Sequence, residues 1–250
     1  MAKKILFICG CARSGTTALW RLMVTHPKIV LGVERYVLLA NQKRNNFSAR
    51  LFEKDKFFDL QPKETFYKEL TAQGYYDIAR ERFDDALWVG DKIPHLFQKY
   101  DEVDAAMPDA HYIYIVRNII DVAGSYQKRA ETGSWKETRD YARAVNDWRH
   151  SLEATLKFRA KADLKSRVHI ISYEELYLQA VKLEPLFAKL DLDVTPQVQA
   201  QYQKTIDKSV ELENRRGDTL TSAKRHYIAL HAPFEAFKEI LEHRVVLPPA

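Results

Sequence analysis

The chain has 250 residues, of which 46% are hydrophobic and 29% are charged, with only 8 glycines and 9 prolines. This composition allows a substantial core and excludes disordered, collagen-like and low-complexity chains. The 39 basic and 34 acidic residues give a net charge of +5 without a run of like charges, which favours a small anionic ligand over a nucleic-acid partner. Cys9 and Cys11 are too close together to staple a fold of this size, so we expect a reducing, cytoplasmic compartment.

The N-terminal segment does not resemble a targeting signal. Lys3 and Lys4 precede the apolar run 5–9, which is too short for the core of a signal peptide. No other stretch is long and apolar enough to cross a bilayer, so we do not expect an integral membrane protein. The run is instead predicted to be the first strand.

Short apolar runs alternate along the chain with longer segments of helical periodicity. The predicted strands are residues 4–9, a weaker one at 29–31, then 87–90, 111–116 and 168–171. This alternation is typical of a mostly parallel sheet, so we predict a three-layer α/β fold in which helices flank a central sheet. We predict one domain over residues 1–250, because no repeat and no linker rich in Pro, Gly or Ser divides the chain.

Helices are predicted between these strands. The first, residues 16–25, ends before Pro27, because proline disfavours a helical conformation in the residue that precedes it. Ser172, with an acidic residue three positions later, forms a capping box after the last strand, and Pro185 marks the first turn of another helix. The polar segment 192–225 is predicted to make a long excursion over one face of the domain.

Residues 10–17 have the sequence GCARSGTT and connect the first strand to the first helix. Glycines bracket this loop, so backbone N–H groups and the helix dipole converge on a point that suits a phosphate group. The glycine spacing matches a P-loop and indicates a P-loop-like fold, but Thr16 stands where a nucleotide triphosphatase has its lysine. The cation of this loop is instead Arg13.

A second cation follows the strand at 111–116. A P-loop kinase has a carboxylate at the end of another strand to hold Mg²⁺, whereas this strand ends in Arg117. A cation there repels a metal ion and attracts a further anionic group. The residues therefore indicate a nucleotide with a short 5′ anhydride and an additional phosphate, bound without a metal.

Two motifs, each after a strand and about a hundred residues apart, resemble those of the sulfotransferases that use 3′-phosphoadenosine 5′-phosphosulfate (PAPS). Residues 13–17, RSGTT, are similar to the loop that binds the 5′ end of this donor. Residues 116–126, VRNIIDVAGSY, are similar to the motif in which an arginine and a serine bind the 3′-phosphate. Segments 90–94 and 171–176 also resemble family segments, and the loop arginine is similar to that of the bacterial and tyrosylprotein-type branch.

The resemblance implies a role for residues of each motif. Arg13 is expected to stabilise charge at the oxygen between the 5′-phosphate and the sulfuryl group. Tyr173 corresponds to an aromatic residue near adenine, with a core tyrosine as the alternative. Residues 215–217 resemble an element that wraps the 3′-phosphate, with a charged surface turn as the alternative. The implied donor-binding residues are Arg13, Ser14, Gly15, Thr16, Thr17, Arg117, Ser125, Tyr173, Arg215, Arg216 and Gly217.

The acceptor hydroxyl loses a proton as it attacks sulfur, so a general base is expected nearby. Glu34 follows a predicted strand where the tyrosylprotein-type branch has its glutamate base, and the alternative is a surface ion pair with Arg35 or a neighbouring helix. Asp91 and His95 are the other candidate bases, although His95 lies out of register with the histidine of the small-phenol branch. Lys92 matches a family lysine that assists the sulfuryl group. The predicted catalytic residues are therefore Arg13, Glu34 and Lys92.

The resulting hypothesis is a PAPS-dependent sulfotransferase that acts by in-line transfer without a metal ion and releases 3′,5′-adenosine bisphosphate (PAP). Its acceptor is expected to be a hydroxyl or amine of a small molecule or saccharide. Two alternatives stay open: a P-loop nucleotide kinase or triphosphatase, which Thr16 disfavours, and a non-catalytic nucleotide-binding module. The acceptor is not specified by these motifs, because loops outside them shape its pocket.

Overall fold

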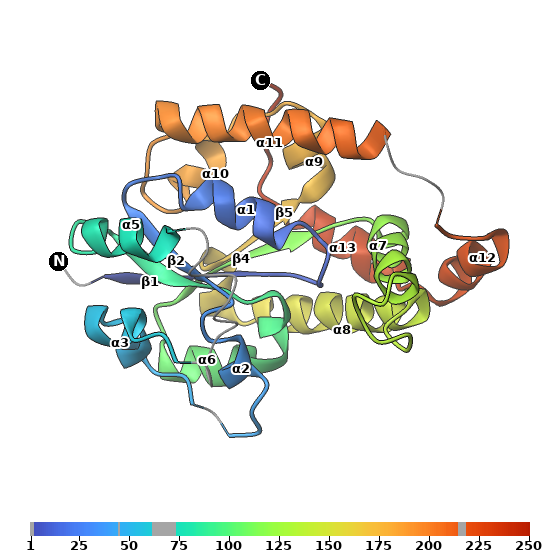
Figure 1. Cartoon of the computed structure of the whole chain (residues 1–250), viewed down its shortest axis with the longest axis horizontal. Helices are drawn as coiled ribbons and strands as arrows, with labels where there is room; N and C mark the ends of the chain where they lie inside the picture. The colour runs from blue at the N-terminus through green and yellow to red at the C-terminus, as the bar shows by residue number, and fades with distance from the viewer. Residues whose placement is uncertain (1–2, 45, 62–73, 215–218) are drawn as a thin grey trace.

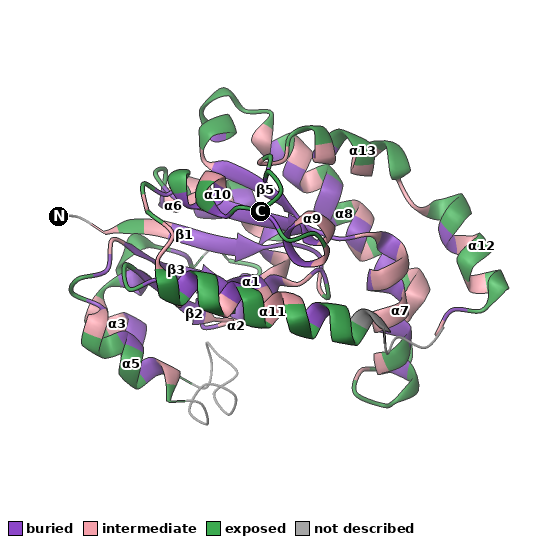
Figure 2. Cartoon of the chain, turned by 90° about the horizontal axis from the view of Figure 1, so that it is seen from above, coloured by how far each residue is buried: buried purple, intermediate pink, exposed green. Residues whose placement is uncertain are grey.

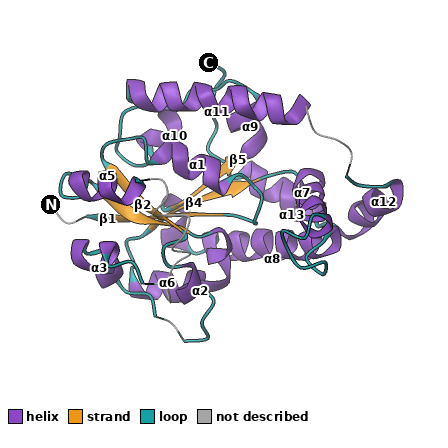
Figure 3. Cartoon of the chain, in the orientation of Figure 1, coloured by secondary structure: helices purple, strands orange, loops and turns teal. Residues whose placement is uncertain are grey.

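A computed structural model of the chain describes residues 3–44, 46–61, 74–214 and 219–250. Figure 1 shows a central sheet between two layers of helices, and Figure 3 shows the strands as the middle layer, so the predicted three-layer α/β fold is confirmed. Within these residues, the sheet has five parallel strands in the order β2-β3-β1-β4-β5. Their bounds are β1 (Lys4–Cys9), β2 (Ile29–Val33), β3 (Trp88–Lys92), β4 (His111–Val116) and β5 (Val168–Ser172).

The strands β2 and β3 extend further than their apolar runs predict. Gly32 pairs with Asp91 and Val33 pairs with Lys92, so the parallel ladder continues into polar residues. Ladder hydrogen bonds and not side-chain polarity therefore decide where these strands end. As a consequence, Lys92 is the last residue of a buried strand.

Helices cover both faces of the sheet, and the N-cap at Ser172 and the proline in the first turn of the helix at 184–188 are confirmed. Among the described helices, none combines the length and the apolarity that spanning a bilayer requires. The helices are α1 (Thr16–Met23), α2 (Val37–Ala40), α3 (Lys54–Phe58), α5 (Tyr75–Arg82), α6 (Tyr100–Ala106), α7 (Ile119–Glu131), α8 (Tyr141–Arg159), α9 (Tyr173–Leu178), α10 (Glu184–Ala188), α11 (Pro196–Asn214), α12 (Ser222–His231) and α13 (Phe234–Glu242), with short 3-10 helices at Ala49–Phe52, Pro94–Lys99 and Ala162–Ser166.

The two faces of the sheet carry separate hydrophobic clusters, because side chains alternate along each strand. Leu6 and Ile8 of β1 pack against α1, α9, α10 and α11. Phe7 and Cys9 belong to the opposite cluster, which includes residues of α6 and α8. Figure 2 shows the strands buried in the middle of the molecule and the outer faces of α11 and α12 exposed.

The predicted excursion at 192–225 is a helix over most of its length. Val198 and Tyr202 of the 19-residue helix α11 are buried, and the helix packs against α1 and α9. The Tyr202 hydroxyl donates a 2.7 Å hydrogen bond to the carbonyl of Leu176 and accepts a 3.1 Å bond from the Val181 N–H. Few positions of this segment are buried, so few of them are apolar. The sequence therefore shows no clear helical periodicity there.

The strand order creates a switch point beside β1. The chain leaves β1 toward β2 on one side of the sheet, whereas it leaves β4 toward β5 on the other. Open α/β sheets bind ligands at such a point, beyond the carboxyl ends of the strands. Both sequence motifs follow these two strands, so the topology places them at the same edge.

Candidate active site

The loop between β1 and α1 has a shape that requires glycine. Gly15 is the N-cap of α1 with φ 95°, and a Cβ added to it would lie 2.5 Å from Cδ2 of Tyr173. Ser14 is fully buried, and its hydroxyl has no hydrogen-bond partner among the residues that the structure describes. A buried hydroxyl and the first-turn N–H groups of the eight-residue helix α1 together suit an anionic group such as a phosphate.

Arg13 joins the first motif to the second. Its Nε donates a 2.9 Å hydrogen bond to the hydroxyl oxygen of Ser125 on α7, 112 positions later in the chain. Burial lowers the pKa of Arg13, and the charges of Arg129 and Arg117 lower it further. The guanidinium nevertheless stays protonated. Three arginines thus concentrate positive charge at this edge of the sheet.

Arg117 follows β4 and is 8% exposed. Its guanidinium carbon lies 3.8 Å from the centre of the Tyr173 ring, and its Nη2 lies 3.5 Å from the Asp121 carboxylate. Because the Tyr173 ring also lies against Gly15, this ring fills the space between the loop at 10–17 and Arg117. Tyr173 is 8% exposed and belongs to the hydrophobic core on this face of the sheet. Residues 215–217 lie outside the described residues.

Glu34 and Lys92 form an ion pair at the ends of β2 and β3. Lys92 Nζ lies 2.5 Å from Glu34 Oε1, and the lysine side chain is only 1% exposed. The Arg35 guanidinium donates hydrogen bonds to the backbone carbonyls of residues 56, 57 and 59.

Two of the predicted catalytic residues have a strained backbone. Arg13 has φ 72° and Glu34 has φ 58°, and Asp191 is the only other non-glycine residue in the described ranges with positive φ. Such conformations persist where the surrounding structure imposes them, and they are concentrated at functional sites. The strain therefore marks these two positions independently of any motif.

Asp91 holds the turn that contains Glu34. Its carboxylate accepts hydrogen bonds from the backbone N–H groups of Arg35 (3.1 Å) and Tyr36 (2.7 Å), and its side chain is fully buried. Burial raises the pKa of Asp91 to about 7, although these hydrogen bonds oppose the shift. Both oxygens of the Asp91 carboxylate are thus engaged by the backbone of the turn that contains Glu34.

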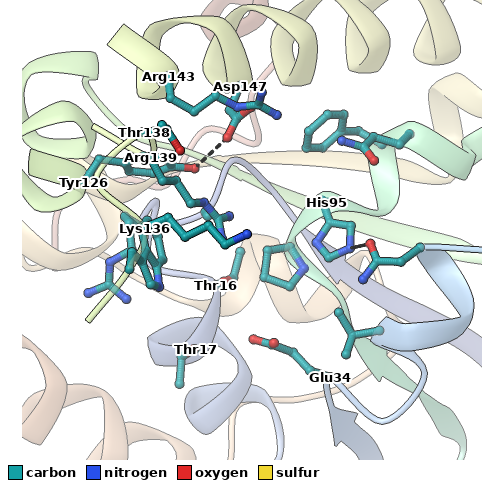
Figure 4. Close-up of a pocket in the computed structure, with 18 residues that line it drawn as sticks. Thr16, Thr17, Glu34, His95, Tyr126, Lys136, Thr138, Arg139, Arg143 and Asp147 are labelled. Carbon is teal, nitrogen blue, oxygen red and sulfur yellow. Dashed lines mark hydrogen bonds and ion pairs between the residues drawn. The ribbon is translucent and has the colours of Figure 1, made fainter. Parts of the chain in front are cut away.

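A pocket of about 810 Å³ opens beside these residues. Figure 4 shows Glu34 and His95 on one side of it, with Thr16 and Thr17 of α1 below the opposite wall. The Asn41 amide oxygen lies 2.9 Å from His95 Nε2 and can only accept, so this nitrogen carries the proton. Burial lowers the pKa of His95. Although out of register in the sequence, His95 lines the same pocket as Glu34.

The wall of the pocket that faces Glu34 carries no residue that the sequence motifs predict. Residues 135–143, between α7 and the first turn of α8, supply Lys136, Arg139 and Arg143 to the lining. A tryptophan beside three closely spaced cations, shortly after the second motif, was an available signal in the sequence. It was missed because no strand or glycine marks this segment.

The model of the Sulfotransferase family matches residues 6–196. The chain belongs to this family. Three solved structures resemble this sulfotransferase in fold: the sulfotransferase domain from the curacin biosynthetic pathway (TM-score 0.54, 23% identity, 88% of this chain and 81% of that one), the sulfotransferase domain from the Synechococcus PCC 7002 olefin synthase (0.53, 19%, 88% and 81%) and mouse sulfotransferase SULT7A1 complexed with PAP (0.51, 16%, 97% and 86%). No curated protein matches the sequence. The family resemblance that the two motifs carry is thereby confirmed.

Proposed function

We propose that this sulfotransferase takes its sulfuryl group from PAPS and transfers it to a hydroxyl or amine of a small molecule or saccharide, without a metal ion. The observation that carries the proposal is the hydrogen bond between Arg13 and Ser125, which joins two anion-binding motifs at the switch point of the sheet. The mouse relative, which has the same fold, was solved with PAP, the product of this donor.

The residues around the loop fit the two anionic ends of PAPS. The buried Ser14 hydroxyl, the N-terminus of α1 and the hydroxyls of Thr16 and Thr17 would hold the 5′ end, with Arg13 beside the sulfuryl group. Arg117 and Ser125 would hold the 3′-phosphate, and the Tyr173 ring would support adenine. Residues 215–217 are proposed to wrap the same phosphate.

Glu34 is the proposed general base. PAPS would supply an activated sulfuryl group when bound. The Glu34 carboxylate would take the proton from the acceptor hydroxyl as the new sulfur–oxygen bond forms, while the bond between sulfur and the 5′-phosphate oxygen breaks and PAP leaves. This carboxylate pairs with the buried Lys92 ammonium. The same ammonium would neutralise negative charge on the sulfuryl group of the donor. Lys92 is therefore proposed to serve both the carboxylate and the sulfuryl group.

Calorimetry tests which class of nucleotide the protein binds. We expect PAP to bind in the presence of EDTA and Mg·ATP to bind weakly or not at all, because Arg117 stands where a kinase has its metal-binding acid. Tight, metal-dependent ATP binding without PAP binding would favour a kinase or triphosphatase. Formation of PAP from PAPS with a mixture of hydroxylated acceptors separates an enzyme from a non-catalytic module.

A further inference from the structure

The wall of the pocket that faces Glu34 carries three cations that the proposed chemistry does not use. Lys136 and Arg139 belong to the connection between α7 and α8, and Arg143 lies in the first turn of α8. In Figure 4 the charged ends of Lys136 and Arg139 extend toward the middle of the pocket, on the side away from Glu34 and His95.

The acidic residues nearby are already engaged. Asp147 pairs with Arg143 at 2.7 Å and accepts a 3.2 Å hydrogen bond from the Tyr126 hydroxyl. Asp140 caps α8 by accepting hydrogen bonds from two backbone N–H groups. Glu34, across the pocket, pairs with Lys92.

Lys136 and Arg139 therefore have no carboxylate of their own. No acidic side chain in the described ranges lies within ion-pair distance of either cation. Both are exposed residues that line the pocket. The pocket thus presents two uncompensated positive charges to whatever enters it.

Arg139 is held in place by aromatic contacts. Its guanidinium carbon lies 4.1 Å from the ring centre of Trp135 and 5.7 Å from that of Tyr126. The two rings pack edge to face at 4.8 Å, and Arg129 lies over Trp135 at 5.3 Å. A stacked guanidinium keeps its planar donors free and ordered, which suits two-point recognition of a carboxylate.

We propose that the acceptor of this enzyme carries a carboxylate in addition to the hydroxyl that is sulfonated. The carboxylate binds Arg139 and Lys136, while the hydroxyl lies at Glu34 and His95. Val37 and Phe97, which also line the pocket, offer apolar contacts to the body of the molecule. This inference rests on the proposed function and narrows its acceptor to hydroxy acids, whether aromatic or aliphatic acids or uronic acids.

Matched acceptor pairs that differ only in this charge provide the test. The pairs are 4-hydroxyphenylacetate with 4-hydroxyphenylacetamide, 10-hydroxydecanoate with its amide, and glucuronate with glucuronamide. Binding to the protein saturated with PAP is measured by calorimetry, and kcat/KM by the formation of PAP from PAPS. We expect the acidic member of at least one pair to bind and react about tenfold better than its neutral partner, and the pair affected identifies the source of the carboxylate.

Variants assign this preference to the proposed residues. In Arg139→Gln and Lys136→Gln the preference should shrink to about twofold, whereas Lys157→Gln, an exposed position of α8, should keep it in full. Thermal melts establish that the variants are folded.

The inference is overturned if the neutral members react equally well, if no acid binds to the PAP complex, or if Arg139→Gln and Lys136→Gln both keep the preference. None of these results affects the proposed function. Failure of PAP itself to bind contradicts the proposed function instead.

Discussion

Lys92 Nζ lies 2.5 Å from Glu34 Oε1, and this ion pair joins the last residue of β3 to the residue that follows β2. The lysine side chain is 1% exposed, so its charge depends on the carboxylate for compensation. Asp91 fixes the turn on the other side by accepting the N–H groups of residues 35 and 36. The proposed base is thus part of the structural core at this edge.

Replacing Glu34 separates its two roles. Glu34→Gln retains a hydrogen-bond acceptor for Lys92 but removes the base, so we expect kcat to fall about 100-fold or more with little change in PAP affinity. Glu34→Ala should also lower the free energy of unfolding by about 3 kcal/mol, because it leaves Lys92 buried without a counter-charge. Sulfonation kinetics and urea denaturation measure the two effects. Glu153→Gln, at an exposed position of α8, is the control, and an unchanged kcat in Glu34→Gln would exclude Glu34 as the base.

His95 offers a direct comparison with Glu34. We expect His95→Ala to lower kcat less than about tenfold, because its ring would orient the acceptor without taking the proton. The measurement is kcat at saturating donor for each single variant and for the double variant with Glu34→Gln. A larger loss in His95→Ala than in Glu34→Gln would assign the base to the histidine.

The two motif arginines should affect different kinetic quantities. Arg13→Ala is expected to lower kcat about 100-fold or more with a smaller change in PAP affinity, because it acts on charge that develops during transfer. Arg117→Ala should weaken PAP binding about 10- to 100-fold, since it removes a charge-assisted contact to phosphate. Arg21→Ala, at an exposed position of α1, is the matched control. Small and equal effects of both variants on kcat and affinity would contradict the assignments.

Backbone strain at Arg13 gives an expectation about stability. Because Arg13 has φ 72°, Arg13→Gly should be about 1 kcal/mol more stable than Arg13→Ala, although both lose activity. Arg21, within the helix α1, should show the opposite order, with glycine about 1 kcal/mol less stable than alanine. Urea denaturation of the four variants tests both signs. The same order at both positions would mean that the strain at Arg13 is absent in solution.

His111 and His169, at the end of the sheet away from the pocket, are expected to make the free energy of unfolding depend on pH. His169 is buried on β5, with its Nε2 3.2 Å from His111 Nδ1, and burial lowers the pKa of His169 from 6.5 to about 3. Between these values the unfolded chain binds the proton and the folded chain does not. The contribution of His169 to stability is therefore fully present above pH 6.5 and falls by about 1.4 kcal/mol per unit as the pH decreases toward 3.

Variants isolate this contribution. His169→Gln should flatten the loss of stability between pH 6 and pH 4, whereas His226→Gln, at an exposed position, should leave the slope of the wild type unchanged. Urea denaturation at several pH values supplies the curves. Parallel curves for His169→Gln and the wild type would show that His169 titrates normally in the folded protein.

The sequence by itself determined the fold class and the family, because both follow from local patterns. Apolar runs at 4–9 and 111–116 match β1 and β4 residue for residue, and the loop at 10–17 is recognisable from its own glycine spacing. The helix α11 was not predicted, because its few buried positions depend on contacts with α1 and α9.

Only the tertiary structure decided how the site is completed. Lys92 lies in a strand because β3 pairs there with both β1 and β2, and the pairing with Val33 brings it to Glu34. His95 lines the pocket from the 3-10 helix that follows β3. Arg139 lines it from the connection between α7 and α8, which contains no recognised motif. These positions depend on which strands are neighbours and how the chain crosses between them, and residue order alone does not encode such long-range packing.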